Sequence, residues 1–440
     1  MNALPMHRMS WASALAVLML TGCVFQDVRT QQSKLETYCR IDGSVSAEQQ
    51  TPSPLLVGLV RHNGGAVEDL KNWSLVDHFV LESPGRWMFR AEPGTYGLVA
   101  FKDVNGDGVY QPGEPFLPVD TNQLVTCASG HTHTEAVLLI PTEGRSRLEG
   151  EIDFMKFQAR TASAQLQHSL GTATAYGPVT TLNDPRFKEE HAAGSLWRPY
   201  DFIIDVGPGV YFLEPYDSRK IPVLFVHGIN GTPTNFRYLV EHLDRTKYQP
   251  WLYYYPSGVR LSGIADHLDQ TMKTLQLQHG FTRYHVIAHS MGGLVSRGFL
   301  LRNQSAHSRA RIPLYITIST PWAGHKAAQA GVDYAPAVVY VWNDMVPKSA
   351  YLTDLFFNQL NGEPVHRALP TGVQHHLLFG FKHRGTGECS DDTVTLASQL
   401  YSGAQADANH LYGFDETHMS ILDSADTSRL VNRLLNDASP

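Results

Sequence analysis

Short apolar runs separated by polar turn residues fill the chain between residues 48 and 142. The runs are three to six residues long, and clusters of Gly, Pro, Asn and Asp lie between them; they occupy 55–60, 79–81, 87–89, 96–101 and 136–140. Many short strands bounded by turn residues are typical of a small β-sandwich. We therefore expect an all-β, sandwich-like domain over residues 48–142.

From about residue 200 the pattern changes to apolar strands that alternate with helices. Continuous apolar runs occupy 221–226, 251–255, 284–288, 314–318 and 376–381. Strands that are apolar on both faces and alternate with helices are typical of a mostly parallel sheet covered by helices on both sides. We expect an α/β domain over residues 200–440, joined to the β-domain by a connector over residues 143–199.

The N-terminus carries a short apolar segment that suits a secretory signal. Residues 11–20 are apolar apart from Ser13, a length too short to span a bilayer. The sequence Leu20-Thr21-Gly22-Cys23 then resembles a bacterial lipobox, and this resemblance implies cleavage before Cys23 and acylation of that cysteine. An ordinary signal peptide with an incidental cysteine is the alternative.

The lipobox reading has consequences for organisation and location. Residues 1–22 become a lipoprotein signal peptide, and the mostly polar residues 23–47 become a tether. Several acyl chains on Cys23 anchor a protein stably in a membrane. We therefore expect a bacterial cell-envelope protein. Val24, directly after the cysteine, favours the outer membrane, with the protein facing the periplasm or the exterior.

Composition and cysteine use narrow the class further. Hydrophobic residues make up 42% and charged residues 18% of the chain, as in a globular protein, and the formal net charge is -7. No long basic run occurs, which argues against a nucleic-acid partner. Of the four cysteines, Cys23 carries lipid on this interpretation. An exported location permits a disulfide between Cys39 and Cys127, which leaves Cys389 over.

One motif with chemical meaning is Ala288-His289-Ser290-Met291-Gly292. It follows an apolar strand and precedes a helix expected over residues 293–301. This strand-turn-helix context is what a nucleophile elbow requires, since a tight turn with small flanking residues projects the serine outward. The helix N-terminus supplies positive potential where an oxyanion develops. We expect Ser290 to be a nucleophile and the His289 side chain to point away from it.

A second motif, His227-Gly228-Ile229-Asn230-Gly231, also follows an apolar strand. Its glycines let the backbone approach a substrate closely. The backbone N–H groups of Ile229 and Met291 are the expected oxyanion hole. His227 is interpreted as structural, and a plain strand-to-helix turn is the alternative for the whole motif.

Together with Ser319-Thr320-Pro321-Trp322-Ala323-Gly324, these two motifs resemble α/β-hydrolases of the serine lipase and esterase type, in particular the triacylglycerol-lipase-like group. The resemblance spans about residues 200–435. It implies the α/β-hydrolase fold and a catalytic order of nucleophile, acid, histidine. On that order Asp391, in Ser390-Asp391-Asp392-Thr393-Val394, matches the acid, with Asp392 as the alternative. His418 matches the base, with His410 as the alternative.

These roles define an expected function. Ser290, Asp391 and His418 hydrolyse carboxylic esters of lipids or other acyl compounds, with no cofactor for catalysis and with the membrane as partner through Cys23. The alternatives are an acyltransferase, thioesterase or phospholipase with the same triad, or a non-catalytic binding protein on a hydrolase scaffold. The segment 322–367 is either a lid or acyl-chain pocket, or ordinary packing helices.

A twelve-residue stretch of the β-domain fits the spacing of a calcium loop. Its ligands are side-chain oxygens and one carbonyl oxygen, from Asp103, Asn105, Asp107, Val109 and Glu114. No helices flank it, which excludes an EF-hand. A structural Ca²⁺ and a metal-free loop of Asx-turns are equally compatible with the sequence.

Overall fold

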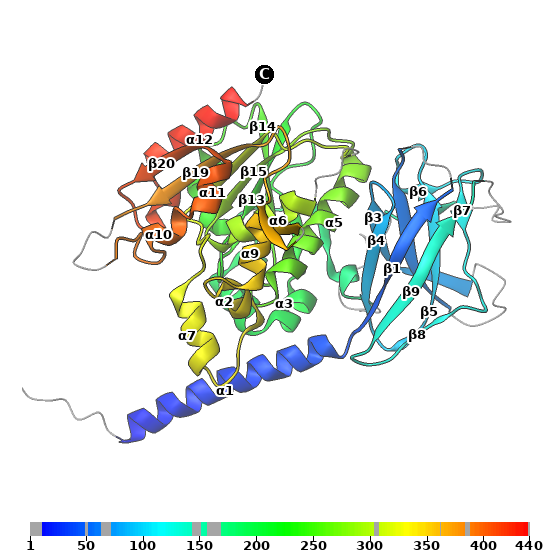
Figure 1. The fold of residues 1–440 in the computed structure, drawn as a ribbon, viewed down its shortest axis with the longest axis horizontal. Coiled ribbons are helices and arrows are strands. Elements are labelled where there is room, and N and C mark those ends of the chain that lie inside the picture. The colour runs from blue at the N-terminus through cyan, green and yellow to red at the C-terminus, as the bar shows by residue number, and fades with distance from the viewer. Residues whose placement is uncertain are drawn as a thin grey trace, which may run out of the picture.

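The computed structural model of the protein describes residues 11–48, 52–62, 72–142, 151–155, 169–302, 308–360, 362–382 and 388–438. A β-domain and a larger α/β-domain lie side by side, and helix α1 (Trp11–Glu36) runs along the α/β-domain towards the β-domain (Figure 1). Within the described part of the chain, no helix combines the length and apolar character needed to cross a bilayer.

An eight-stranded sheet forms the centre of the α/β-domain. Its strand order is β11-β12-β14-β13-β15-β16-β19-β20, and every neighbouring pair is parallel except β12 with β14. The expected mostly parallel sheet is therefore confirmed. The strands are β11 (Ala175–Val179), β12 (Gly209–Phe212), β13 (Ile221–Val226), β14 (Tyr248–Tyr254), β15 (His285–His289), β16 (Leu314–Ile318), β19 (Gln374–Gly380) and β20 (Ala408–Phe414).

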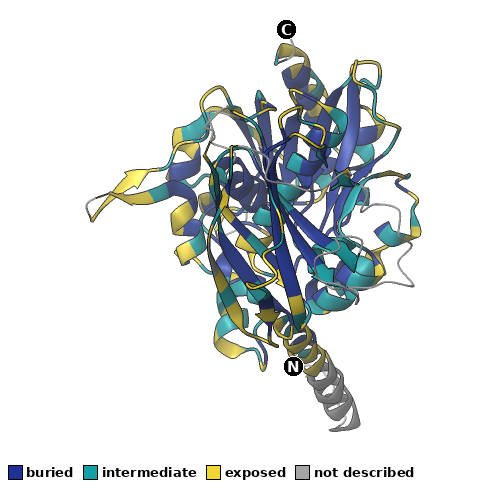
Figure 2. Cartoon of the chain, turned by 90° about the vertical axis from the view of Figure 1, so that its right-hand side faces the viewer, coloured by how far each residue is buried: buried dark blue, intermediate teal, exposed yellow. Residues whose placement is uncertain are grey.

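Helices cover both faces of this sheet because its strands are apolar on both faces. On β13, Leu224 and Val226 join the core beneath α5 (Leu261–His279) and α6 (Met291–Arg302). Val223 and Phe225 point to the opposite core, with α3 (Pro199–Asp205), α4 (Arg237–Glu241) and α12 (Ala425–Asp437). This alternation follows the two-residue period of a strand. Figure 2, in which the β-domain faces the viewer, draws the buried residues of the interior in dark blue and the exposed residues of the surface in yellow.

Helices and a hairpin fill the segment after β16. The elements are α7 (Lys326–Tyr334), α8 (Tyr340–Met345), α9 (Ala350–Phe356), β17 (Phe357–Leu360) and β18 (Glu363–His366), and short helices α10 (Leu396–Gln399) and α11 (Ser402–Asp407) follow β19. Helix α5 begins at Leu261 and ends before Gly280, whose φ of 65° terminates it in the left-handed conformation that glycine tolerates best.

Two sheets with a shared apolar core form most of the β-domain, and β6 and β10 form a separate two-stranded sheet. One sheet has the order β4-β1-β9 and the other β3-β2-β5-β7, with β8 paired to β5. Residues of both sheets, such as Ile41 and Val57, contribute to one buried cluster. The strands are β1 (Cys39–Ala47), β2 (Leu55–His62), β3 (Trp73–Leu81), β4 (Gly85–Ala91), β5 (Gly94–Lys102), β6 (Val109–Tyr110), β7 (Phe116–Leu117), β8 (Val125–Cys127), β9 (Thr132–Ile140) and β10 (Ile152–Asp153).

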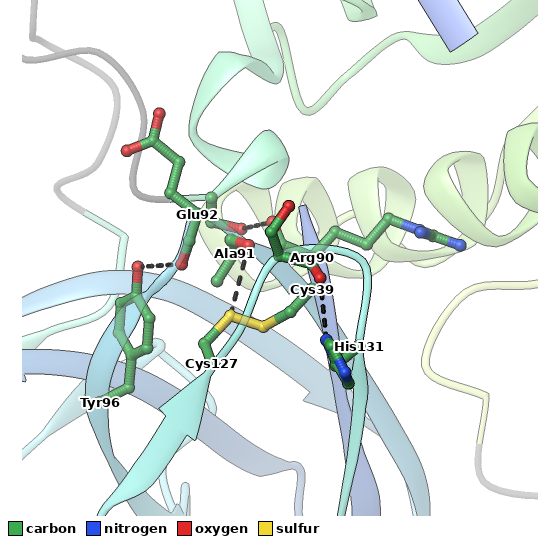
Figure 3. The surroundings of a disulfide bond; sticks show 9 residues. Cys39, Arg90, Ala91, Glu92, Tyr96, Cys127 and His131 are labelled. Atoms are coloured by element: carbon green, nitrogen blue, oxygen red, sulfur yellow. Dashed lines mark hydrogen bonds between the residues drawn. A yellow bond between two sulfur atoms is a disulfide. The ribbon is translucent and has the colours of Figure 1, made fainter. Parts of the chain in front are cut away.

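A disulfide joins Cys39, at the start of β1, to Cys127, at the end of β8, and this pairing agrees with the sequence expectation. Their Cα atoms are 5.8 Å apart, and 88 residues separate them in sequence. Figure 3 shows the bond beside Arg90 and Ala91, at the end of β4, and Glu92. Cys389 is free and exposed.

Two expected boundaries differ from the structure. Strand β1 lies inside the predicted tether 23–47, so the β-domain begins at Cys39 and α1 occupies most of the remaining tether. Strand β11 and helices α2 (Glu189–Trp197) and α3 lie inside the predicted connector 143–199, yet β11 is the edge strand of the central sheet. Both segments carry polar residues or glycine within their strands, which hid them from a search for apolar runs.

Candidate active site

Ser290 occupies a sharp turn between β15 and α6. Its φ of 53° is unusual for a residue with a side chain, and its N–H donates to the carbonyl of Ile318 at 2.8 Å. A Cβ atom added at Gly292 would lie 2.2 Å from the carbonyl oxygen of Val226, so only glycine fits there. Strained backbone of this kind persists only where the surrounding structure holds it, and it clusters at functional sites. The turn has the form of the expected elbow.

The loop after β13 lies directly against this serine. A Cβ atom added at Gly228 would lie 2.8 Å from Ser290 Cβ and 3.2 Å from Ser290 Oγ. Among the described contacts, no group accepts a hydrogen bond from the N–H of Ile229 or of Met291, the first residue of α6. The first N–H groups of a helix have no partner within it. The assignment of these two amides to an oxyanion hole stays a prediction.

Asp391 and His418 form a buried pair. His418 Nδ1 donates to Asp391 Oδ2 at 2.8 Å, and the backbone N–H of His418 donates to the carbonyl of Asp391 at 2.7 Å. Burial raises the pKa of the Asp391 carboxyl, but its hydrogen bond to His418, the charge of His418 and the N–H groups of Val394 and Thr393 outweigh it. The pKa therefore lies below its usual value, and the carboxylate stays ionised.

The alternative acid, Asp392, and the alternative base, His410, lie outside the buried Asp391–His418 pair. Asp392 has a φ of 74° and is exposed. His410 is exposed on β20, where its ring stacks on that of His376 with centroids 5.3 Å apart. His227 stacks on Tyr255, and burial lowers its pKa to about 4, so it is a neutral packing residue as expected.

His289 connects the elbow to the Asp391–His418 pair. Its Nε2 hydrogen-bonds to the carbonyl oxygen of His418 at 2.8 Å, and the two rings are 4.6 Å apart. Burial, followed by the charge of His418, lowers the pKa of His289 to about 3. A neutral His289 must carry its proton on Nε2 to make this bond. The hydrogen bonds among the described residues do not include one from Ser290 Oγ to His418, a bond that is often long before substrate binds.

Sequence reasoning missed two residues that shape this region. Gln399 is buried, accepts from the N–H of Gly380 at 3.1 Å and donates to the carbonyl of Val394 at 3.0 Å, which ties the acid loop to β19. Thr320 lies so close to Gly293 that a Cβ there would be 2.0 Å from its Oγ1. A glutamine in an otherwise apolar helix gives only a weak signal, and the Thr320 contact crosses between elements.

The segment after β16 reaches the acid loop. His325, which caps α7, hydrogen-bonds through Nε2 to the carbonyl of Thr393 at 2.8 Å. At the other end of α7, Tyr334 is 84% exposed. The segment therefore borders the candidate site, and the lid interpretation stays a prediction.

In the expected calcium loop, the acidic side chains are engaged by the loop itself. Each carboxylate oxygen of Asp103, Asp107 and Glu114 accepts a hydrogen bond from the loop, for example the 2.9 Å bond from Gly108 N to Asp103. Asn105 Oδ1 accepts from the N–H of Asp107 at 3.2 Å. In the described ranges, no three His, Cys, Asp or Glu side chains converge as a metal ion requires. Each of these oxygens keeps a further lone pair, so the calcium interpretation stays a prediction.

The comparisons with known proteins agree with the α/β fold described above. Residues 221–359 match a family described as alpha/beta hydrolase fold. Comparison with curated proteins finds no match. Among solved structures, the mature lipase BlEst2 of Bacillus licheniformis is 18% identical with a TM-score of 0.40, and the alignment covers 51% of this chain and 97% of that one. Phospholipase PlaB of Legionella pneumophila is 19% identical with a TM-score of 0.32, covering 41% and 45%.

The family match covers the loop 227–231 after β13 and the turn at Ser290. It ends before Asp391 and His418. Its fold is that of hydrolases, and the parallel sheet with helices on both faces agrees with it. The α/β-domain of this chain therefore has the alpha/beta hydrolase fold.

Proposed function

We propose that this protein is a serine hydrolase that cleaves carboxylic esters of lipids or other acyl compounds. The observation that carries the proposal is the His418–Asp391 hydrogen bond, which His289 links to the strained turn at Ser290. A nucleophile, an orienting acid and a base between them are the parts that acyl transfer to serine requires.

Each residue has a role in the proposed reaction. His418 takes the proton of Ser290 as its oxygen attacks the acyl carbonyl, and Asp391 stabilises the charged imidazole. The N–H groups of Ile229 and Met291 bind the tetrahedral oxyanion. The alcohol leaves with the proton from His418, and water then releases the acyl group from the serine by the same steps.

A fluorophosphonate probe tests this proposal directly, because it labels only activated serines. We expect the wild-type chain to be labelled and Ser290→Ala to remain unlabelled. Ser296→Ala is a matched control, since Ser296 lies one and a half turns further along α6 and hydrogen-bonds within the helix. A folded wild-type chain that takes no label would refute the proposed serine hydrolase activity.

Substrate specificity distinguishes the possible acyl groups and acyl acceptors. A panel of p-nitrophenyl esters of increasing chain length, a thioester and a phosphatidylcholine separates esterase, thioesterase and phospholipase activity. Preference for an alcohol acceptor over water would instead identify an acyltransferase.

The proposed location is the bacterial outer membrane, with lipid on Cys23. The side chain of Cys23 lies outside the described residues, and support comes from the lipobox and from the Cys39–Cys127 disulfide, which suits an oxidising, exported compartment. Cys23→Ala should release the chain from membranes, whereas Cys389→Ala should not. Membrane retention of the Cys23→Ala chain would refute anchoring at this residue.

We also propose that residues 103–114 bind a structural Ca²⁺, with a metal-free loop of Asx-turns as the alternative. Millimolar Ca²⁺ should then raise the melting temperature of the wild-type chain relative to EGTA. The Asp107→Asn variant should then lose that shift. Identical melting curves in Ca²⁺ and EGTA would assign the loop to Asx-turns alone.

A further inference from the structure

A cavity of about 550 Å³ lies between the β-domain and the α/β-domain, apart from the candidate active site. Its walls come from the end of α1, from β3 and β4, from the end of β14 and from the first turns of α5. Ser290, Asp391 and His418 are not among its lining residues. The volume lies in the range of small-molecule sites, which often form at domain interfaces.

Most of the cavity wall is apolar. Phe79, Met88 and Phe89 line it from the β-domain, and Ile203, Val259 and Ile264 line it from the α/β-domain. Gly263, on α5, leaves open space, because a Cβ atom added there would meet no other atom within 4 Å. The cavity therefore offers an apolar slot.

The acidic groups at the wall already have partners within the protein. Asp77 accepts from Ser169 and from the N–H of His78, and Glu36 accepts from Tyr340. Burial raises the pKa of Asp77 to about 6, which weakens its negative charge further. Asp266 pairs with Arg302. These carboxylates therefore give no reason to expect a cationic ligand.

Arg90 is different. It extends from β4 away from the disulfide and lines the cavity (Figure 3). Among the described contacts the guanidinium forms no ion pair or hydrogen bond. Burial lowers the pKa of Arg90, and the like charge of Arg40 lowers it further. The other arginine of the wall, Arg260, pairs with Asp344 at 2.8 Å. The positive charge of Arg90, at the edge of the apolar slot, can therefore pair with a bound anion.

We propose that this interdomain cavity binds an amphiphile with a single apolar chain and an anionic head group, carboxylate or phosphate. The head pairs with Arg90, whose planar fork of N–H donors matches both oxyanions. The chain lies along the apolar wall between β4 and α5. This site is independent of the proposed ester hydrolysis, because it uses none of the residues assigned to that reaction.

Tyr255 lies between this cavity and the loop that follows β13. It lines the cavity, its hydroxyl donates to the carbonyl of His227, and its ring stacks on the His227 ring at 4.1 Å. The amphiphile therefore lies on the far side of Tyr255 from His227 and the loop that follows β13.

Calorimetric titration tests the proposal with the full chain carrying Cys23→Ala, which needs no detergent. The probes are dodecanoate and dodecyl phosphate below their critical micelle concentrations, and dodecanol below its solubility limit. We expect the two anions to bind and dodecanol to bind at least tenfold more weakly. The tighter of the two anions identifies the head group as carboxylate or phosphate.

Three variants locate the site. Arg90→Gln should weaken binding of the anions at least tenfold and leave dodecanol unchanged. Arg86→Gln is the matched control, since Arg86 is exposed on the same strand and does not line the cavity. Gly263→Phe should fill the slot and abolish binding of all three probes while the chain keeps its melting temperature. Wild-type affinity in both Arg90→Gln and Gly263→Phe, or no binding by the wild-type chain, would overturn the proposal.

Discussion

Backbone geometry separates two neighbouring aspartates at the scale of single residues. Asp391 is buried and receives N–H groups from Val394 at 2.6 Å and Thr393 at 3.0 Å, which fix its carboxylate opposite His418. Asp392 adopts a φ of 74° and turns outward. Only the first carboxylate can orient the histidine.

We expect Asp391→Asn to lower kcat on a short p-nitrophenyl ester by about 10³–10⁴-fold, because the amide no longer stabilises the charged imidazole. The matched Asp392→Asn variant should keep kcat within about twofold, as exposed side chains contribute little. Steady-state kinetics of both variants provide the measurement. The reverse order of effects would assign the acid to Asp392.

His289 should act as a positioning residue for His418. His289→Leu removes the hydrogen bond to the carbonyl of His418. We expect kcat to fall on the order of tenfold, the effect of about one hydrogen bond, while KM stays unchanged because His289 does not touch the substrate. His289→Gln, which retains an N–H donor, should recover most of the rate. Equal losses in both variants would indicate a packing role instead.

Sequence reasoning reached the serine and the candidate acid and base, but not the contacts that order them. Ser290 was identifiable because a strand, a tight turn and a helix are local features. The choice between Asp391 and Asp392 depends on which N–H groups face each carboxylate, and the role of His289 depends on a residue 129 positions away. Such contacts exist only after the chain has folded.

The same distinction applies at the scale of elements. Strands β13 and β16 match their apolar runs end to end, because both faces of these strands are buried. Strand β1 carries Gly43, Ser44 and Ser46 and was missed, as was the edge strand β11. Edge or polar strands gain their stability from pairing, which leaves little trace in hydrophobicity.

The disulfide between β1 and β8 should be a major stabiliser of the β-domain. Its loop of 88 residues predicts about 4.6 kcal/mol from the restricted unfolded chain. We expect the double variant Cys39→Ser/Cys127→Ser to unfold at a clearly lower urea concentration than the wild type. Cys389→Ser, which removes an exposed free thiol, should unfold like the wild type. An unchanged midpoint in the double variant would contradict this prediction.

At the scale of the whole molecule, both domains and the interface between them bury neutral histidines. Burial is the first cause of every shift, and it lowers the pKa to about 3 or 4 in His78, His227, His267, His285, His289, His375 and His376. His78 hydrogen-bonds across the interface to Thr274 at 3.1 Å, so the contact between the domains depends on this state as well.

These histidines should make the fold sensitive to mild acid. Between pH 6.5 and about 4 they bind protons in the unfolded chain but not in the folded one, so the free energy of unfolding must fall as the pH falls, by up to about 1.4 kcal/mol per pH unit for each histidine. Asp77, whose pKa burial raises to about 6, acts in the opposite direction, as do Glu82, Asp103, Glu114 and Asp423, whose pKa burial also raises. The seven histidines outnumber these carboxyls. We therefore expect the urea midpoint to be nearly constant above pH 7 and to drop steeply from pH 6.5 to 4.5. His267→Asn should make that drop shallower, whereas His131→Gln, at an exposed position, should leave it unchanged. A midpoint that stays constant down to pH 4.5 would show that these histidines are charged within the fold.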